Sequence, residues 1–135
     1  MKKDDCIFCK LANGEIPTNA IYEDDTFKVI LDMGPAAKGH ALILPKDHYD
    51  NLFEIDDQVA GKAMILAKKL ANKMMDKLGA DGLNLVQNNN EAAGQTVNHF
   101  HLHVIPRYKD DGQNILWNPT KPSEEELKEV CELLK

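Results

Sequence analysis

The residues of this 135-residue chain that are best suited to chemistry are its five histidines, which fall in two short stretches. His40 and His48 lie in the first, while His99, His101 and His103 alternate with apolar residues in the second. Alternate side chains of a β-strand share one face and lie roughly 6.6 Å apart. We therefore expect three imidazoles in a row, opposite a face that packs into the core. A neutral imidazole can act as a nucleophile, a proton carrier or a metal ligand, so this pattern predicts a functional site.

The loop before this row offers groups that suit a phosphate. Gly94, Gln95 and Thr96 supply a backbone N–H, an amide and a hydroxyl directly before the histidines. Such donors stabilise the charge on a phosphate or on its transition state. No basic cluster accompanies them, so hydrogen bonds and imidazole groups would have to hold the anion. Taken alone, the tripeptide is equally compatible with a simple turn.

Two of the three cysteines, Cys6 and Cys9, have the Cys-x-x-Cys spacing that is typical of metal or redox chemistry. The thioredoxin-type βαβ pattern is absent around them, which disfavours a redox pair. Two thiolates need two more ligands to complete a tetrahedral zinc site, and His48 and His99 are the best candidates. Two unliganded thiols are the alternative. Cys131, on the last expected helix, is interpreted as an inert packing residue.

The elements that must position these residues follow from hydrophobic periodicity and from turn residues. Strands are expected at residues 20–23, 26–31, 40–45, 83–87 and 100–105, and helices at residues 6–13, 57–78 and 123–134. The nearly all-apolar third strand should be central and covered on both faces. This order predicts an α+β fold, with a five-stranded, mostly antiparallel sheet, one long helix on a face and short terminal helices.

Composition excludes several classes of protein. With 43% hydrophobic residues and no linker-like tract, residues 1–135 are expected to form a single domain. The apolar runs are too short to span a bilayer, so no membrane association is expected. A net charge of -6 argues against binding to long nucleic acids. The odd cysteine number and the lack of a signal-type N-terminus predict a cytoplasmic protein without a disulfide framework.

The chain resembles the histidine triad superfamily of nucleotide hydrolases and transferases. Residues 99–105, His-Phe-His-Leu-His-Val-Ile, match its signature of histidines that alternate with apolar residues. Further matches occur in the same order at residues 6–10, 14–17, 22–24, 31–32, 38–40, 44–48, 94–97 and 103–107. The similarity covers nearly the whole chain and is strongest to a bacterial branch related to the Hint purine nucleoside phosphoramidases. It implies a histidine-triad-like fold and a homodimer.

The resemblance also implies a role for each matching residue. His101 would attack the α-phosphorus to give a covalent nucleotidyl-histidine, which water then cleaves. The expected catalytic residues are His101, His103, Thr96 and Gln95. The expected nucleotide-binding residues are Asp32 at the ribose, Phe8 and Met33 at the base, Asn88 and Gly94 near the phosphate, and His40 beside the triad. The expected ligands of a structural zinc ion are Cys6, Cys9, His48 and His99.

These expectations predict a zinc-containing hydrolase of nucleoside 5′-phosphoramidates, the adducts of AMP or GMP with an amine. Three alternatives remain open: a hydrolase of dinucleoside polyphosphates, a nucleotide-binding regulatory protein with little turnover, and a protein whose imidazole row loads metal ions. The tail after Arg107 contains Trp117 followed by a helix, unlike the tail of animal Hint relatives. The preference for the leaving group therefore stays open.

Overall fold

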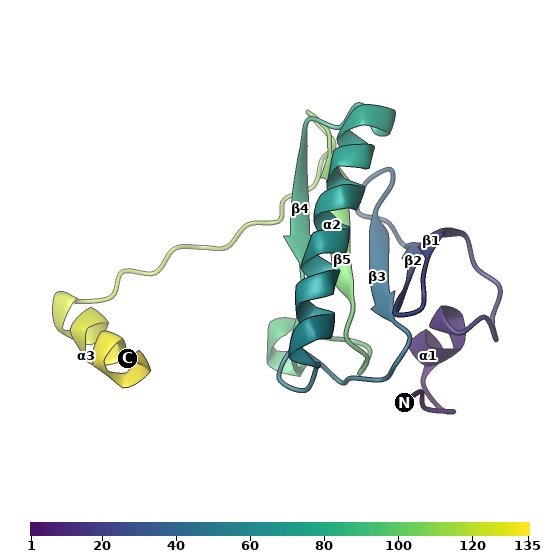
Figure 1. The fold of residues 1–135 in the computed structure, drawn as a ribbon. Helices are drawn as coiled ribbons and strands as arrows, with labels where there is room; N and C mark the ends of the chain where they lie inside the picture. Colours follow the sequence, from purple (N-terminus) through teal and green to yellow (C-terminus); the bar gives the residue numbers. More distant parts are fainter.

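The computed structural model describes residues 1–135 and is built around a five-stranded sheet (Figure 1). Its strands are β1 (Ala20–Glu23), β2 (Phe27–Leu31), β3 (Ala41–Pro45), β4 (Gly82–Val86) and β5 (Leu102–Arg107). They lie in the order β1-β2-β3-β5-β4, and every neighbouring pair is antiparallel. The predicted sheet is therefore confirmed, and β3 lies at its centre with all five residues buried.

The long helix α2 (Asp57–Leu78) covers one face of the sheet. Its limits match the prediction, because the Asp56 carboxylate accepts hydrogen bonds from two backbone N–H groups at the start and Gly79 is left-handed at the end. The apolar stripe of α2 packs on alternate residues of the strands, and together they form the main core. Its members include Val29, Ile43, Leu66, Leu70, Phe100, Leu102 and Val104.

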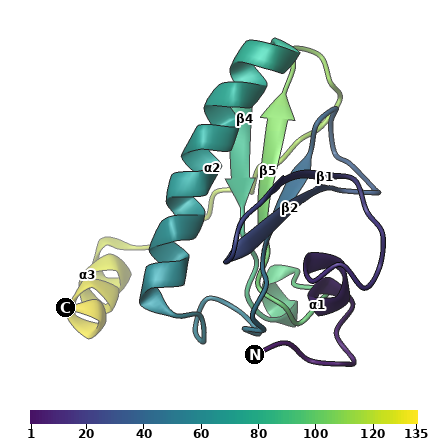
Figure 2. The same ribbon diagram turned by 45° about the vertical axis from the view of Figure 1, so that its right-hand side comes forward.

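The short helix α1 (Ile7–Ala12) packs on β2 and β3 from the other side (Figure 2). Ala12 forms a second, smaller core with residues of the strands whose side chains point away from α2, namely Ile30, Leu42 and Leu44. Because strand side chains alternate, residues such as His103, which pairs with Leu42, also belong to this face. The α1 face of the sheet is thus the one that carries the histidines.

The fifth strand differs from its predicted limits of 100–105. It begins at Leu102 and continues through Pro106 to Arg107. The start is delayed because the backbone N–H of Phe100 donates to the carbonyl oxygen of Tyr49, at 2.7 Å, and not to a strand. His99 and His101 therefore lie just before β5, and only His103 lies within it.

The C-terminal helix α3 (Glu124–Leu134) stands apart from the rest of the molecule at the end of an extended segment (Figure 1). The Ser123 hydroxyl caps it as predicted, accepting from the N–H of Glu126 at 3.1 Å. Cys131 was expected to be a packing residue, but it is exposed because α3 stands apart from the sheet and from the other helices (Figure 1). None of the helices combines the length and the apolar character required to cross a membrane.

Candidate functional site

The expected row of three imidazoles forms only in part. His101 and His103 lie side by side with ring centroids 5.0 Å apart, and His40 adds a third ring 5.1 Å from His103. His99 is directed elsewhere, toward the two cysteines near α1. The difference follows from the backbone, since residues 99–101 precede the strand and do not follow its alternation. The site is therefore His40, His101 and His103, with His99 in a separate cluster.

One backbone contact fixes the chemistry of His101. Its Nδ1 lies 2.7 Å from the carbonyl oxygen of His99, which can only accept a hydrogen bond, so Nδ1 carries the proton. In the neutral ring Nε2 then holds the free lone pair. Nε2 has no hydrogen-bond partner in the chain, and solvent can reach it, because every fully buried side-chain nitrogen or oxygen has a partner. Burial lowers the pKa of His101, which keeps the ring neutral and its lone pair available.

A second set of contacts fixes the protons of His40 and His103. The N–H of Ala36 donates to Nδ1 of His40 at 2.9 Å, so His40 carries its proton on Nε2. That proton faces Nδ1 of His103 at 2.9 Å and a carboxylate oxygen of Asp32 at 3.4 Å. His103 therefore accepts at Nδ1 and keeps its own proton on Nε2, where it can donate. Burial, aided by His101 and His40, lowers the pKa of His103 to about 4.

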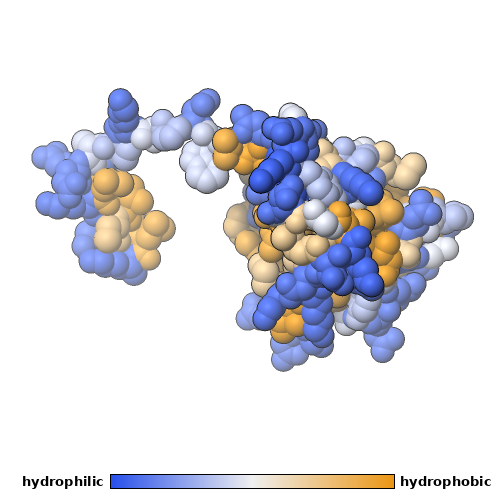
Figure 3. All heavy atoms as spheres, turned by 90° about the horizontal axis from the view of Figure 1, so that it is seen from above, coloured by the Kyte–Doolittle hydropathy of each residue, from blue (hydrophilic) through white to orange (hydrophobic).

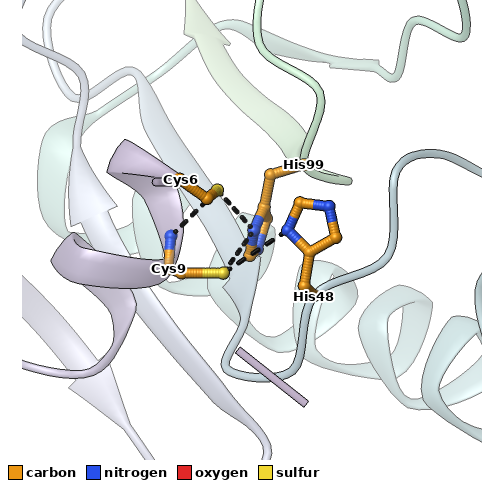
Figure 4. A group of neighbouring side chains, drawn as sticks. All are labelled: Cys6, Cys9, His48 and His99. Atoms are coloured by element: carbon orange, nitrogen blue, oxygen red, sulfur yellow. Dashed lines mark hydrogen bonds between the residues drawn. The ribbon is translucent and has the colours of Figure 1, made fainter. Parts of the chain in front are cut away.

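The four predicted zinc ligands come together as a cluster at the N-terminal end of α1 (Figure 4). Nδ1 of His99 lies 3.4 Å from the sulfurs of both Cys6 and Cys9, and Nδ1 of His48 lies 3.4 Å from that of Cys9. All four ligand atoms are within 4.8 Å of one another. Tetrahedral zinc with sulfur at 2.3 Å and nitrogen at about 2.05 Å places these atoms about 3.6 Å apart, so the cluster fits the ion.

The partners behind the two histidines support the same interpretation. Nε2 of His99 donates to the carbonyl oxygen of Pro45 at 2.9 Å, and Nε2 of His48 donates to the Asp50 carboxylate at 2.6 Å. Each ring therefore turns an unprotonated Nδ1 toward the cysteines, as metal-ligating histidines require. Burial also lowers the pKa of His99 to about 4, despite the opposing hydrogen bond to Pro45. Neutral imidazole is the form that binds metal.

The sequence did not point to Asp50. It lies two residues after His48, and this close spacing of a carboxylate to a candidate ligand was the signal that could have identified it.

The polar loop between β4 and β5 is held together by Gln95. Its buried side chain accepts from the N–H of Asn90 at 2.7 Å and donates to the carbonyl oxygens of Asp50 and Val97, at 2.6 and 3.0 Å. These contacts use the oxygen and both amide hydrogens, so in this structure Gln95 orders the loop and offers no free donor. Thr96, the next residue, is exposed. The catalytic roles expected for both stay predictions.

The residues expected at the nucleotide surround the histidines to different degrees. Phe8 on α1 packs edge-on against His101, with centroids 4.9 Å apart. Asp32 follows β2 and reaches His40, whereas Met33 is 89% exposed and packs on little else. Asn88 lies beside Gly94, where a Cβ would come 3.6 Å from its amide nitrogen. The structure thus brings Phe8 and Asp32 to the histidine row, and it leaves Met33 at the surface.

The fold and the site together define an α+β domain with paired imidazoles on one face of its sheet and a Cys2His2 cluster beside them. A family model described as the HIT domain matches residues 13–110. The chain therefore belongs to the histidine triad (HIT) family, as the sequence predicted.

Relatives of known sequence include an uncharacterized HIT-like protein of Methanocaldococcus jannaschii, 44% identical over 93% of this chain and 98% of that protein. An adenosine 5′-monophosphoramidase of Schizosaccharomyces pombe is 35% identical over 94% of this chain and 93% of its own.

Among solved structures, a HIT family protein from Bacillus anthracis matches with a TM-score of 0.89 and 36% identity, over 98% of this chain and 96% of the other. A Zn-bound histidine triad family protein from Mycobacterium smegmatis matches with a TM-score of 0.78 and 34% identity, over 96% and 95% of the two chains. These matches confirm the HIT-like fold.

Proposed function

We propose that this protein hydrolyses nucleoside 5′-phosphoramidates of purine nucleotides through a covalent intermediate on His101. The observation that carries the proposal is the 2.7 Å contact between Nδ1 of His101 and the carbonyl oxygen of His99. It leaves Nε2 as a preset nucleophile, and it does so without a charged partner. The similarity to a monophosphoramidase of Schizosaccharomyces pombe supports this choice of substrate.

The proposed reaction has two displacements at phosphorus. In the first, Nε2 of His101 forms a bond to the α-phosphorus while the phosphorus–nitrogen bond breaks, and the amine leaves with a proton taken up from solvent. In the second, water attacks the same phosphorus and gives a proton back to solvent, the bond to His101 breaks so that its ring is neutral again, and a nucleoside monophosphate is released. His103, protonated on Nε2, donates a hydrogen bond to the phosphate or to the leaving group. His40 holds His103 in that tautomer.

The remaining residues would bind the nucleotide. Asp32 would accept hydrogen bonds from the ribose hydroxyls, while Phe8 and Met33 would flank the base. Thr96 and the loop that contains Asn88 and Gly94 would contact the phosphate, with Gln95 ordering that loop. The position of Asp32 within 3.4 Å of His40 supports this arrangement, because the carboxylate expected to bind the ribose lies next to the imidazoles.

We further propose that Cys6, Cys9, His48 and His99 hold a structural zinc ion, which would tie α1 to the segment after β3 and to the segment before β5. A closed set of four ligands leaves no position for a reacting water, so zinc would supply stability. The relative from Mycobacterium smegmatis that is described as Zn-bound supports this proposal. We also propose a cytoplasmic location, which the odd number of cysteines supports.

The test compares wild type with His101→Ala for AMP release from a lysine–AMP phosphoramidate and from diadenosine polyphosphate. We expect turnover of the phosphoramidate to fall by about 10³-fold or more in the variant. Quenched wild-type reactions should also carry a nucleotidyl adduct on His101. Zinc content and AMP affinity serve as controls for folding.

Two other results would change the assignment. Cleavage of the polyphosphate alone would make that class the substrate. AMP binding without turnover of either compound, unchanged in His101→Ala, would refute the enzyme and leave a nucleotide-binding protein.

A further inference from the structure

Lys28 on β2 is a charged residue in a buried position. It is the one lysine, arginine, aspartate or glutamate among the buried residues of the chain, and it is 9% exposed. Charged side chains usually stay at the surface, where the hydrophilic residues are seen in Figure 3. A buried lysine normally pairs with an acceptor, so the surroundings of its ammonium group decide whether its role is structural.

The ammonium group of Lys28 has no partner within the chain. The acid opposite it in register, Glu23 on β1, instead binds Nζ of Lys46 at 2.8 Å. Nζ of Lys28 is open to solvent, because every fully buried side-chain nitrogen or oxygen has a partner. The stem of this lysine is therefore buried while its tip offers a free, positively charged donor. An acceptor on a ligand would compensate for the cost of placing that charge in an apolar wall.

Lys28 belongs to the same face of the sheet as the candidate site. Phe27 and Val29 lie in the main core under α2, so the residues between and after them, Lys28 and Ile30, point to the α1 face. Asp32 comes two residues later, and its carboxylate lies beside His40 on that face. Lys28 and Asp32 thus stand roughly 13 Å apart along one row, with Ile30 between them.

This row gives a bound base one direction in which to lie. In the proposed function, on which this inference rests, the phosphate binds at His101 and the ribose at Asp32. Because β2 ends just before Asp32, the sheet continues from it only back over Ile30 toward Lys28. Phe8 on α1 packs on the ring of His101 and also on the small core that contains Ile30. A base held between α1 and β2 therefore turns its outer edge toward Lys28.

We propose that Lys28 selects guanine nucleotides by donating a hydrogen bond from Nζ to O6 of the base. Guanine carries two adjacent acceptors, O6 and N7, whereas adenine has an amino group in place of O6. A positively charged donor therefore stabilises guanine and opposes the amino group of adenine. The apolar contacts of Ile30 and Phe8 are open to both purines, so the discrimination depends on the lysine.

The experiment measures the dissociation constants of GMP, IMP and AMP for the full-length protein by isothermal titration calorimetry. IMP has O6 and N7 but lacks the 2-amino group of guanine, so it separates the effect of the acceptors from that of the amino group. The test variant, Lys28→Met, keeps an unbranched stem and removes the ammonium group. The matched control, Lys77→Met, removes an exposed lysine of α2, on the opposite face of the sheet.

We expect wild type to bind GMP and IMP about five- to tenfold more tightly than AMP, the lower part of the range for a base contact, because the ammonium group is open to solvent. Lys28→Met should bind the three nucleotides alike, and Lys77→Met should keep the wild-type preference. Lys28→Met should also unfold at or above the wild-type temperature, because an apolar side chain replaces an unpaired buried charge. Thermal unfolding therefore serves as its control for folding.

Four results would overturn the inference. They are equal binding of the three nucleotides by wild type, tighter binding of AMP, a preference for GMP over IMP and AMP alike, and a preference that Lys28→Met retains. The third would assign the selection to the 2-amino group. All four still include nucleotide binding, so they leave the proposed function standing. Binding of none of the three by wild type would overturn the proposed function and the inference together.

Discussion

Replacing Asp50 by alanine tests whether the carboxylate behind the Cys/His cluster sets its affinity for zinc. Asp50 accepts a hydrogen bond of 2.6 Å from Nε2 of His48. This contact keeps the proton on Nε2 and turns the lone pair of Nδ1 toward Cys9, whose sulfur lies 3.4 Å away. Without the carboxylate, His48 can adopt the other tautomer, so part of the binding energy is spent on restoring the ligating one. We therefore expect the Asp50→Ala variant to bind zinc more weakly.

The expected loss of zinc affinity depends on how exposed the Asp50 carboxylate is. Removing such a partner from a metal-ligating histidine reduces metal affinity by about 10–100-fold, or about 1.4–2.8 kcal/mol. The Asp50 side chain is 43% exposed, so water can replace part of its role, and we expect a loss near the lower end. For a chain of this size, about 1.4 kcal/mol lowers the Tm of the zinc-bound protein by about 4–7 °C at equal zinc concentration.

The assay is competition for zinc against a chromophoric chelator, with thermal unfolding as a second measurement. Asp50→Asn keeps an acceptor oxygen and should fall between wild type and Asp50→Ala. The matched control is Asp47→Ala, because Asp47 is 66% exposed and pairs only with the terminal amino group, at 3.1 Å. A zinc affinity of Asp50→Ala equal to that of wild type would refute the reasoning. An equal loss in Asp47→Ala would do so as well.

Two further predictions concern stability. Gly39 has φ +92°, and a Cβ there would lie 2.5 Å from Leu78 and 3.1 Å from Pro106, so Gly39→Ala should lower the free energy of unfolding by about 2–4 kcal/mol in urea denaturation. Gly79→Ala, at φ +65° but in open space, should cost only about 1 kcal/mol, and equal losses would contradict the argument from crowding. Burial lowers the pKa of His103 from 6.5 to about 4, so as the pH falls the unfolded chain takes up a proton at this residue before the folded chain does. The contribution of the neutral His103 to stability is therefore present above pH 6.5 and is lost between pH 6.5 and 4, by up to about 3 kcal/mol. His103→Gln should therefore show a shallower fall of stability over this range, and identical slopes would exclude the effect.

The sequence predicted the sheet and the long helix well because both depend on local patterns. The apolar stripe of α2 and its caps at Asp56 and Gly79 are set within a few residues, and the run of buried residues in β3 marks a central strand. The limits of β5 were less accurate. They depend on the contact of Phe100 with Tyr49, 51 residues earlier in the chain, which no local pattern reports.

The candidate site shows the same division. Residue types and spacing were enough to propose the zinc ligands and the pair His101 and His103. They were not enough to predict that the His99 ring leaves the face shared by His101 and His103, or to assign the protons on the rings. Those depend on backbone groups such as the N–H of Ala36 and the carbonyl oxygen of Pro45, whose types carry no signal in the sequence. The exposure of α3 was also not predicted, because the spacing of its apolar residues is typical of a helix that packs on a core.

His99 connects the two halves of the site. Its side chain joins the Cys/His cluster through Nδ1, while its own carbonyl oxygen accepts the 2.7 Å hydrogen bond from His101. Because Nε2 of His99 is held by Pro45, at the end of β3, three contacts fix this one residue. A metal that holds the ring also holds the carbonyl oxygen that orients His101. The proposed zinc site therefore contributes to the orientation of the proposed nucleophile through the backbone of His99. It would do so although four protein ligands leave no position on the ion open to a substrate.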